Sequence, residues 1–295
     1  MKRLFILFLL ISQFSFAQTD SLKALRIAVG VEATLYSGSL YGLNKMWYSG
    51  YPRSGFHWHN DNNAWLQMDK VGHATTAYQV GLLGMNLMEW GGVSKKKAIW
   101  YGGAYGAVFL TTIEVLDGFS EEWGASWGDL IANTSGSALL IGQELLWEEQ
   151  RVQMKYSFYP SRFAEQSPDL LGTNRLQQSI KDYNAQTYWL STNLYSFMPE
   201  SKLPKWLNIA VGYGADGMIS GTSVAFTIME GGCYAAPHRN RQFYLGIDVD
   251  LRKIDTGKPF WNKVLKMASF IKIPAPAFGY DKNSGITFYP IYYGQ

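Results

Sequence analysis

Three long runs without an ionisable side chain limit the folds that this chain can adopt. They span residues 74–88, 98–113 and 130–143 and lie in segments where small and apolar residues are mixed as in helices. At about 1.5 Å per residue, the longest run extends roughly 24 Å, which is less than the ~30 Å hydrocarbon core of a bilayer. We therefore expect helices at 26–48, 69–92, 95–118 and 127–150 that form a buried bundle or lie in a locally thinned membrane.

Small residues recur at helical spacing inside these segments. Gly102 and Gly106 are four residues apart, and so are Ala132 and Gly136. This spacing permits helix backbones to approach closely, in lipid above all. It favours a tightly packed bundle.

Composition excludes several classes of protein. Charged residues make up 17% of the chain and aromatic residues 16%, so the chain can bury itself and is not intrinsically disordered. Cys233 is the single cysteine, which excludes a disulfide scaffold. Lys2 and Arg3 account for most of the +3 net charge, so the rest of the chain is nearly neutral and predicts no nucleic-acid partner.

The N-terminal residues have the pattern of a secretory signal peptide. Lys2 and Arg3 precede an apolar run at 4–11, and Ser15 and Ala17 supply the small residues of a cleavage site. We expect residues 1–17 to be removed and the protein to be exported to the bacterial cell envelope, with a retained anchor as the alternative. No cysteine follows the expected cleavage site, so lipid attachment at a new N-terminal cysteine is not expected.

The second half of the chain has a different character. Residues 156–203 are polar and predict a loop-rich connection with one helix at 173–195, and the alternation F-Y-L-G-I-D-V-D-L at 243–251 predicts a half-buried strand. Residues 261–270 predict a short amphipathic helix, and 286–293 a further strand. The expected fold is mainly α: about four short apolar helices at 18–155, membrane-associated, with an α+β extension of short strands at 204–295.

Ionisable residues inside the helical region fall in pairs at helical spacing. Carboxylates beside otherwise charge-free helices are costly to bury unless they are paired or bind a cation. We expect them to converge on one polar cluster between the helices. Its members are Asp69, Lys70, His73, Glu114, Asp117, Asp129 and Asn133.

Three interpretations of this cluster remain open. It is a network of ion pairs that stabilises the bundle, a pocket for a lipid head group or another ligand, or a catalytic site. In the catalytic version, His73, Glu114, Asp117 and Asp129 are the candidate residues for hydrolysis of a membrane lipid or phosphoester, with or without a metal. The sequence identifies no cofactor.

Two other patterns are weaker. His57, His59 and Asp61 alternate and would share one face of an extended segment, as three weak candidates for metal ligands. They lie in an aromatic loop, residues 47–65, which predicts a membrane–water boundary, the cover of a pocket or a packed lid. Residues 212–217 match G-x-G-x-x-G, but no clear helix follows, so a dinucleotide site is not expected.

Taken together, D-K-V-G-H at 69–73, E-V-L-D-G at 114–118 and S-W-G-D-L-I-A-N-T-S-G at 126–136 resemble the YfiM-like predicted periplasmic lipoproteins, a bacterial envelope family of unknown function. The second half is similar to longer members from Bacteroidota-like bacteria, on the segments at 183–191, 204–208 and 273–277. The resemblance implies export, an envelope location and a helical core, and it assigns no residue a role.

The sequence therefore predicts an uncharacterised, exported, membrane-associated envelope protein. Its expected role is non-enzymatic, structural or lipid-binding, and membrane lipid is the expected partner. The alternative is the hydrolase described above. Protein partners and the choice between the two envelope membranes are not indicated.

Overall fold

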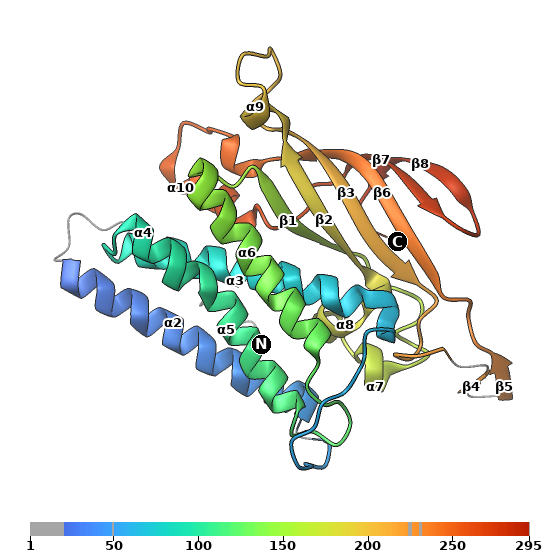
Figure 1. Ribbon diagram of the computed structural model, residues 1–295. Coiled ribbons are helices and arrows are strands. Elements are labelled where there is room, and N and C mark those ends of the chain that lie inside the picture. Colours follow the sequence, from blue (N-terminus) through green and yellow to red (C-terminus); the bar gives the residue numbers. More distant parts are fainter. Residues whose placement is uncertain (1–20, 49, 224–225, 230–231, 295) are drawn as a thin grey trace.

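The structure is a computed structural model that describes residues 21–48, 50–223, 226–229 and 232–294. The predicted signal peptide at 1–17 lies outside the described residues. Long helices pack beside a curled antiparallel sheet (Figure 1). In the sequence, the long helices precede all the strands of this sheet.

The four predicted helical segments all form helices. They correspond to α2 (Ser21–Leu43) with the π-helical turn η2 (Asn44–Tyr48), α3 (Met68–Trp90), the continuous run α4 (Lys95–Lys97), η4 (Ala98–Gly102) and α5 (Gly103–Asp117), and α6 (Trp127–Trp147). A short 3-10 turn, η3 (Ala64–Gln67), leads into α3.

Within the described residues, one helical run, Lys95–Asp117, is long and apolar enough to cross a membrane. Length and composition alone give this result, and core helices of water-soluble proteins meet the same criterion, so no membrane span is assigned.

Close contacts between these helices depend on glycine, as the spacing predicts. A Cβ atom placed on Gly106 would lie 2.0 Å from the carbonyl oxygen of Ala77, and one on Gly136 would lie 2.0 Å from that of Ala74. Gly102 is equally tight, with Met85 Cα 2.4 Å from the position of its absent Cβ. α3 therefore packs against both α5 and α6, at backbone distances that leave no room for a side chain larger than that of glycine at these positions.

The prediction of a mainly helical fold with minor strands is wrong. The structure is a mixed fold in which a six-stranded antiparallel sheet, ordered β1-β2-β3-β6-β7-β8, is a major component. Its strands are β1 (Val152–Phe158), β2 (Gln186–Asn193), β3 (Leu207–Asp216), β6 (Asn240–Val249), β7 (Ala275–Asp281) and β8 (Gly285–Tyr292).

The segment predicted as a loop-rich connection contributes to this sheet. It contains the last three residues of β1 and all of β2, and the helix expected at 173–195 is limited to α8 (Arg175–Lys181). The remaining elements are short: α7 (Pro168–Leu171), η5 (Tyr183–Ala185), α9 (Leu194–Phe197), β4 (Phe226–Met229), β5 (Gly232–Ala235), η6 (Leu251–Lys253) and α10 (Pro259–Ala268).

The polar and apolar faces of the sheet are reversed relative to an ordinary half-buried sheet, in which the apolar face is the buried one. The strand predicted at 243–251 is confirmed as β6, but its apolar side chains Phe243 and Leu245 are exposed by 47% and 53%. Its polar alternates Gln242 and Asp248 are buried. The sheet thus points polar groups toward its interior and apolar groups outward.

Four polar residues of the inner face, Lys155, Ser191, Asn208 and Asp248, form one hydrogen-bonded network. Lys155 Nζ lies 2.7 Å from Asp248 Oδ2 and donates to the carbonyl of Val249 at 2.8 Å. Ser191 donates to Asp248 at 2.6 Å and accepts from Asn208 at 2.8 Å. Such a buried network is stable only when its members are paired, as they are here.

The sheet is curled because its first strand bonds to a segment much later in the chain. Tyr156 N donates to the carbonyl of Phe270 at 2.8 Å, and Lys272 N donates to the carbonyl of Tyr156 at 2.9 Å. This pairing joins β1 to residues that immediately precede β7. It encloses the inner face, where Trp189, Tyr244 and Tyr292 form an aromatic cluster.

Helix α3 covers one part of the outer face of the sheet. Tyr78 of α3 packs in a cluster with Met154 of β1, and Met68 packs with Tyr188 of β2. This contact places the N-terminal half of α3, which carries the predicted polar residues, between the sheet and the other helices.

Candidate functional site

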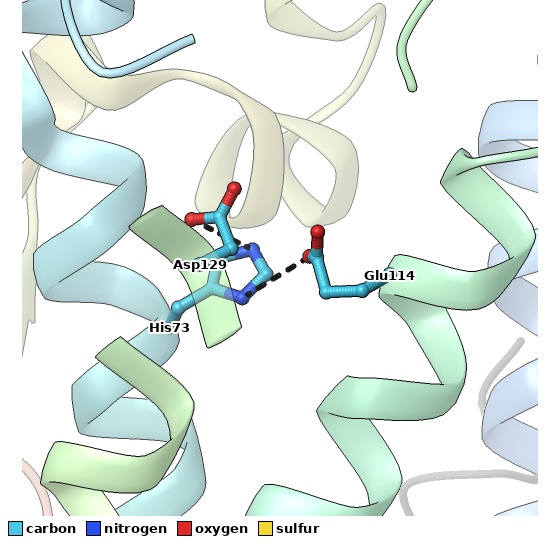
Figure 2. A group of neighbouring side chains, drawn as sticks. All are labelled: His73, Glu114 and Asp129. Carbon is cyan, nitrogen blue, oxygen red and sulfur yellow. Dashed lines mark ion pairs between the residues drawn. The ribbon is translucent and has the colours of Figure 1, made fainter. Parts of the chain in front are cut away.

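The predicted polar residues converge where the first turns of α3 and α6 meet the end of α5. We call the following group the polar centre: Asp61, Asp69, Lys70, His73, Glu114, Ser126, Asp129 and Asn133. Figure 2 shows the His73 ring between the carboxylates of Glu114 and Asp129, which project from α5 and α6.

Lys70 is the hub of one half of the polar centre. Its Nζ lies 2.6 Å from Asp61 Oδ1, 2.7 Å from Asp129 Oδ2 and 3.0 Å from Asp69 Oδ2. Burial disfavours the charged ammonium group, but the surrounding carboxylates outweigh it and raise the pKa of Lys70 above its ordinary value. Lys70 is therefore charged and links α3, α6 and the loop before α3.

Ser126 joins the two halves and was not among the predicted residues. Its hydroxyl donates to Asp61 Oδ1 at 2.5 Å and accepts from Asp129 N at 3.3 Å, which is an N-terminal cap of α6. Its backbone N donates to Glu114 Oε2 at 3.0 Å. The cap pattern S-x-x-D at 126–129 is the signal that could have identified it.

His73 lies at the centre of the other half. Its Nδ1 is 3.0 Å from Asn133 Oδ1 and 3.8 Å from Glu114 Oε1, and its Nε2 is 3.9 Å from Asp129 Oδ1. The side chain is 21% exposed, whereas those of Glu114 and Asp129 are 3% and 6% exposed. His73 is thus the accessible member of this half.

Several buried polar atoms in the polar centre have no hydrogen-bond partner. They are Asp69 Oδ1, Asp129 Oδ1 and Asn133 Nδ2. A buried carboxylate oxygen without a donor costs about 1–3 kcal/mol or more relative to a satisfied one. The two orphaned oxygens show that the protein groups alone do not satisfy the polar centre.

Asp117 belongs to the same region but has a different partner. It accepts a 2.6 Å hydrogen bond from the hydroxyl of Tyr48, in η2. Burial raises the pKa of Asp117 to about 6, and the Tyr48 bond works against that shift. Tyr48 was not singled out as a site residue; its membership of the aromatic loop was the available signal.

The pKa of Glu114 is raised further than that of Asp117. Burial, followed by repulsion from Asp129, raises its pKa to about 8. A carboxyl group in this state is protonated at neutral pH unless a cation lies close to it.

Stability is accordingly expected to fall as the pH rises from about 5 toward 8. The folded pKa of Glu114 is raised to about 8 from 4.5, so its contribution is present below the ordinary value and is lost as pH rises through the folded value. Urea unfolding with EDTA present, at pH values across this window, measures the slope, which is at most about 1.4 kcal/mol per pH unit per proton. The slope should flatten in Glu114→Gln, and an unchanged slope would contradict the assignment.

The weaker candidates do not form a site of their own. Asp61 turns to Lys70, whereas His57 Nδ1 contacts Ser54 Oγ and the carbonyl of Gly55, both at 3.2 Å. In the described part of the chain, the groups of three side chains with metal-ligand spacing are His73–Glu114–Asp129 and Asp61–Asp69–Asp129. Neither includes His57 or His59.

The start of α3 is held in an unusual conformation. Trp65, Leu66 and Gln67 have φ values of 47°, 50° and 64°, in the left-handed region that residues other than glycine rarely adopt. Trp65 N donates to the carbonyl of Gly221 at 2.7 Å, which helps to fix this turn. The turn sets the direction in which Asp69 and Lys70 enter the polar centre.

An exposed aromatic patch adjoins the polar centre. Trp58 and Trp127 stack with ring centroids 4.3 Å apart, and Phe56 contacts both Trp58 and Phe119. All four rings are exposed, Trp127 by 63%. The aromatic loop, with Phe119 and Trp127, therefore forms an exposed surface, and Trp127 directly follows Ser126 of the polar centre in the sequence.

The comparison with known families covers this region. Residues 56–142 match the family described as "Predicted periplasmic lipoprotein (DUF2279)". The matched segment contains every residue of the polar centre. It supports the family-level resemblance and export to the cell envelope, while the function of that family is unknown. The narrower YfiM-like and Bacteroidota assignments stay predictions.

No curated protein and no solved structure matches the chain significantly.

Proposed function

We propose that this protein is a non-enzymatic envelope protein that binds a membrane surface through the outer face of its sheet, while the polar centre holds its helices in register. The observation that carries the proposal is the inverted sheet: the apolar side chains point outward and the polar ones inward. Hydrolysis of a lipid or phosphoester, the alternative expectation, stays a prediction.

The outer face is extensive and uncharged in its middle. Two cross-strand rows of paired residues run from β2 to β8 and a shorter third row runs from β2 to β6, and their exposed members are aliphatic and aromatic. The members that are more than two-fifths exposed are Leu190, Ile209, Val211, Phe243, Leu245, Ile247, Phe278, Tyr280, Ile286 and Phe288.

Such a surface is unfavourable in water. Each large apolar side chain contributes about 1.5–3 kcal/mol when it is fully removed from water. Contiguous apolar surfaces of this kind mark sites that contact a membrane or another protein. Lipid suits this face because the middle rows offer no charged group for a protein partner to recognise.

The aromatic patch is a second exposed surface that suits lipid. Trp58 and Trp127 combine a large apolar ring with an N–H group, a combination enriched at the membrane–water boundary.

A vesicle-binding experiment tests the proposal. The purified chain is mixed with vesicles of phosphatidylethanolamine and phosphatidylglycerol and separated by flotation. Leu245→Glu and, separately, Val211→Glu are expected to lower the vesicle-binding constant about tenfold, because a tenfold change requires only about 1.4 kcal/mol and a carboxylate in hydrocarbon costs more. The matched control is Leu176→Glu on α8, which changes an equally exposed leucine away from the sheet.

The oligomeric state separates lipid from the main alternative occupant. If the face is covered by a second copy, light scattering will show a dimer that Leu245→Glu dissociates while vesicle binding stays unchanged. That result would contradict the proposal.

A further inference from the structure

The polar centre divides into a neutralised half and a half that lacks a cation. Lys70 Nζ already occupies the space between Asp61, Asp69 and Asp129, so that group of carboxylates has its counter-charge. Glu114 has no lysine or arginine within ion-pair distance among the described residues, and His73 is its nearest basic group at 3.8 Å. The carboxyl group that has no lysine or arginine partner is therefore beside His73.

An orphaned atom marks the same place. Asp129 Oδ1 is buried, has no hydrogen-bond partner and faces His73 Nε2 at 3.9 Å, while Oδ2 of the same carboxylate is held by Lys70. The residue is 4% exposed, so water does not reach this oxygen freely. A buried carboxylate oxygen in this position is favoured only when a cation or a donor binds it.

The donor atoms have the spacing of a metal site. One ligand atom each from His73, Glu114 and Asp129 lies within 4.8 Å of the other two. Bonds of about 2.0–2.2 Å from nitrogen and carboxylate oxygen to one ion would draw these atoms together by a small movement of the side chains. Figure 2 shows the three side chains converging from three helices.

A neighbouring residue orients the imidazole. Asn133 Oδ1 lies 3.0 Å from His73 Nδ1, and Asn133 is fully buried on α6. When Nδ1 donates to this carbonyl oxygen, the lone pair of Nε2 faces the orphaned Asp129 Oδ1. A histidine ligand held through its second nitrogen in this way is the usual arrangement around protein-bound metal ions.

We propose that His73, Glu114 and Asp129 bind one divalent metal ion of the zinc or manganese class. One imidazole nitrogen and two carboxylate oxygens form a donor set that both ions accept, and the exposed edge of His73 leaves a side from which solvent or an anionic ligand reaches the metal. The ion gives Glu114 the cationic partner that it lacks and binds the unpartnered Asp129 Oδ1. This inference does not depend on membrane binding.

Titration of the purified, chelator-stripped chain with ZnCl2, and separately with MnCl2, tests the proposal. Calorimetry and elemental analysis are expected to show a single bound ion, and the thermal midpoint should rise with its concentration. His73→Gln and Glu114→Gln should each weaken binding at least tenfold.

Two controls make the test specific. Glu144→Gln removes a buried carboxylate from α6, where Gln150 rather than the polar centre is its partner, and it should bind the ion as the unchanged chain does. His57→Gln removes a histidine from the aromatic loop, and it should also leave binding unchanged.

A second readout covers the case in which a variant fails to fold. Co²⁺ added to the unchanged chain should give the visible absorption of a site with nitrogen and oxygen ligands, and excess Zn²⁺ should abolish it. The proposal is overturned if the unchanged chain binds none of these ions. It is equally overturned if folded His73→Gln binds them normally, or if His57→Gln is the variant that loses them.

Discussion

Lys70→Met is expected to destabilise the protein by about 3–5 kcal/mol, which is the usual cost of removing one partner from a buried ion pair. The substitution keeps the length of the side chain but leaves Asp61, Asp69 and Asp129 close together without the ammonium group that all three contact. A domain is commonly stable by about 5–15 kcal/mol, so a large part of its stability would be lost. Urea unfolding followed by circular dichroism measures the change.

The same substitution in an exposed ion pair is the control. Lys95 Nζ lies 2.7 Å from Glu148 Oε2, but both side chains are largely exposed, so Lys95→Met should leave the urea midpoint unchanged. Adding Asp69→Asn to Lys70→Met should restore part of the loss, because it removes one of the repelling charges. Equal midpoints for Lys70→Met and Lys95→Met would show that Lys70 does not organise the polar centre.

Gly136→Ala is expected to lower the free energy of unfolding by about 3 kcal/mol, at the upper end of ordinary overpacking. The added methyl group would lie 2.0 Å from the carbonyl oxygen of Ala74, so α6 and α3 would have to separate. Because Asn133 and Asp129 precede Gly136 on the same helix, the movement would also shift the contacts to His73 and Lys70. Thermal unfolding and the affinity for Zn²⁺ measure the two effects.

Gly142→Ala is the matched control on the same helix. Nothing lies within 4 Å of the position of its Cβ, so only helix propensity changes and the protein should be stabilised by up to about 1 kcal/mol. If both substitutions stabilise α6, the close approach of α3 and α6 at Gly136 is not present in solution.

The helices and their polar centre were predictable because both follow from helical spacing. Charge-free runs marked the buried helices, and the i, i+4 pairs Asp69–His73 and Asp129–Asn133 placed their polar groups on single faces. Their convergence was predictable because charged groups beside buried apolar helices are costly unless they pair with one another. The contacts of Asp61 and Ser126 were not predictable in the same way, since they depend on how two loops return to the helices.

The extent of the sheet was missed for a physical reason. A strand is normally recognised by apolar residues that face the core, and here the core side of β2 carries Ser191 and Asn193 beside Trp189. In β6 the alternation identified the strand but not which of its faces is buried. Polar residues on the enclosed face made β2 and the end of β1 look like a connection.

The pairing between β1 and the residues before β7 has a consequence for how the protein forms. The backbone of Tyr156 can bond to Phe270 and Lys272 only after most of the chain has been synthesised. Until then, the inner face of the sheet, which contains Lys155, stays open to water. Long-range pairing of this kind slows folding and leaves strand edges open in the meantime. A chain that crosses a membrane unfolded would therefore expose the apolar side chains of its strands before the buried polar groups are paired. It would then need early binding to a lipid surface or to a holding chaperone to avoid aggregation.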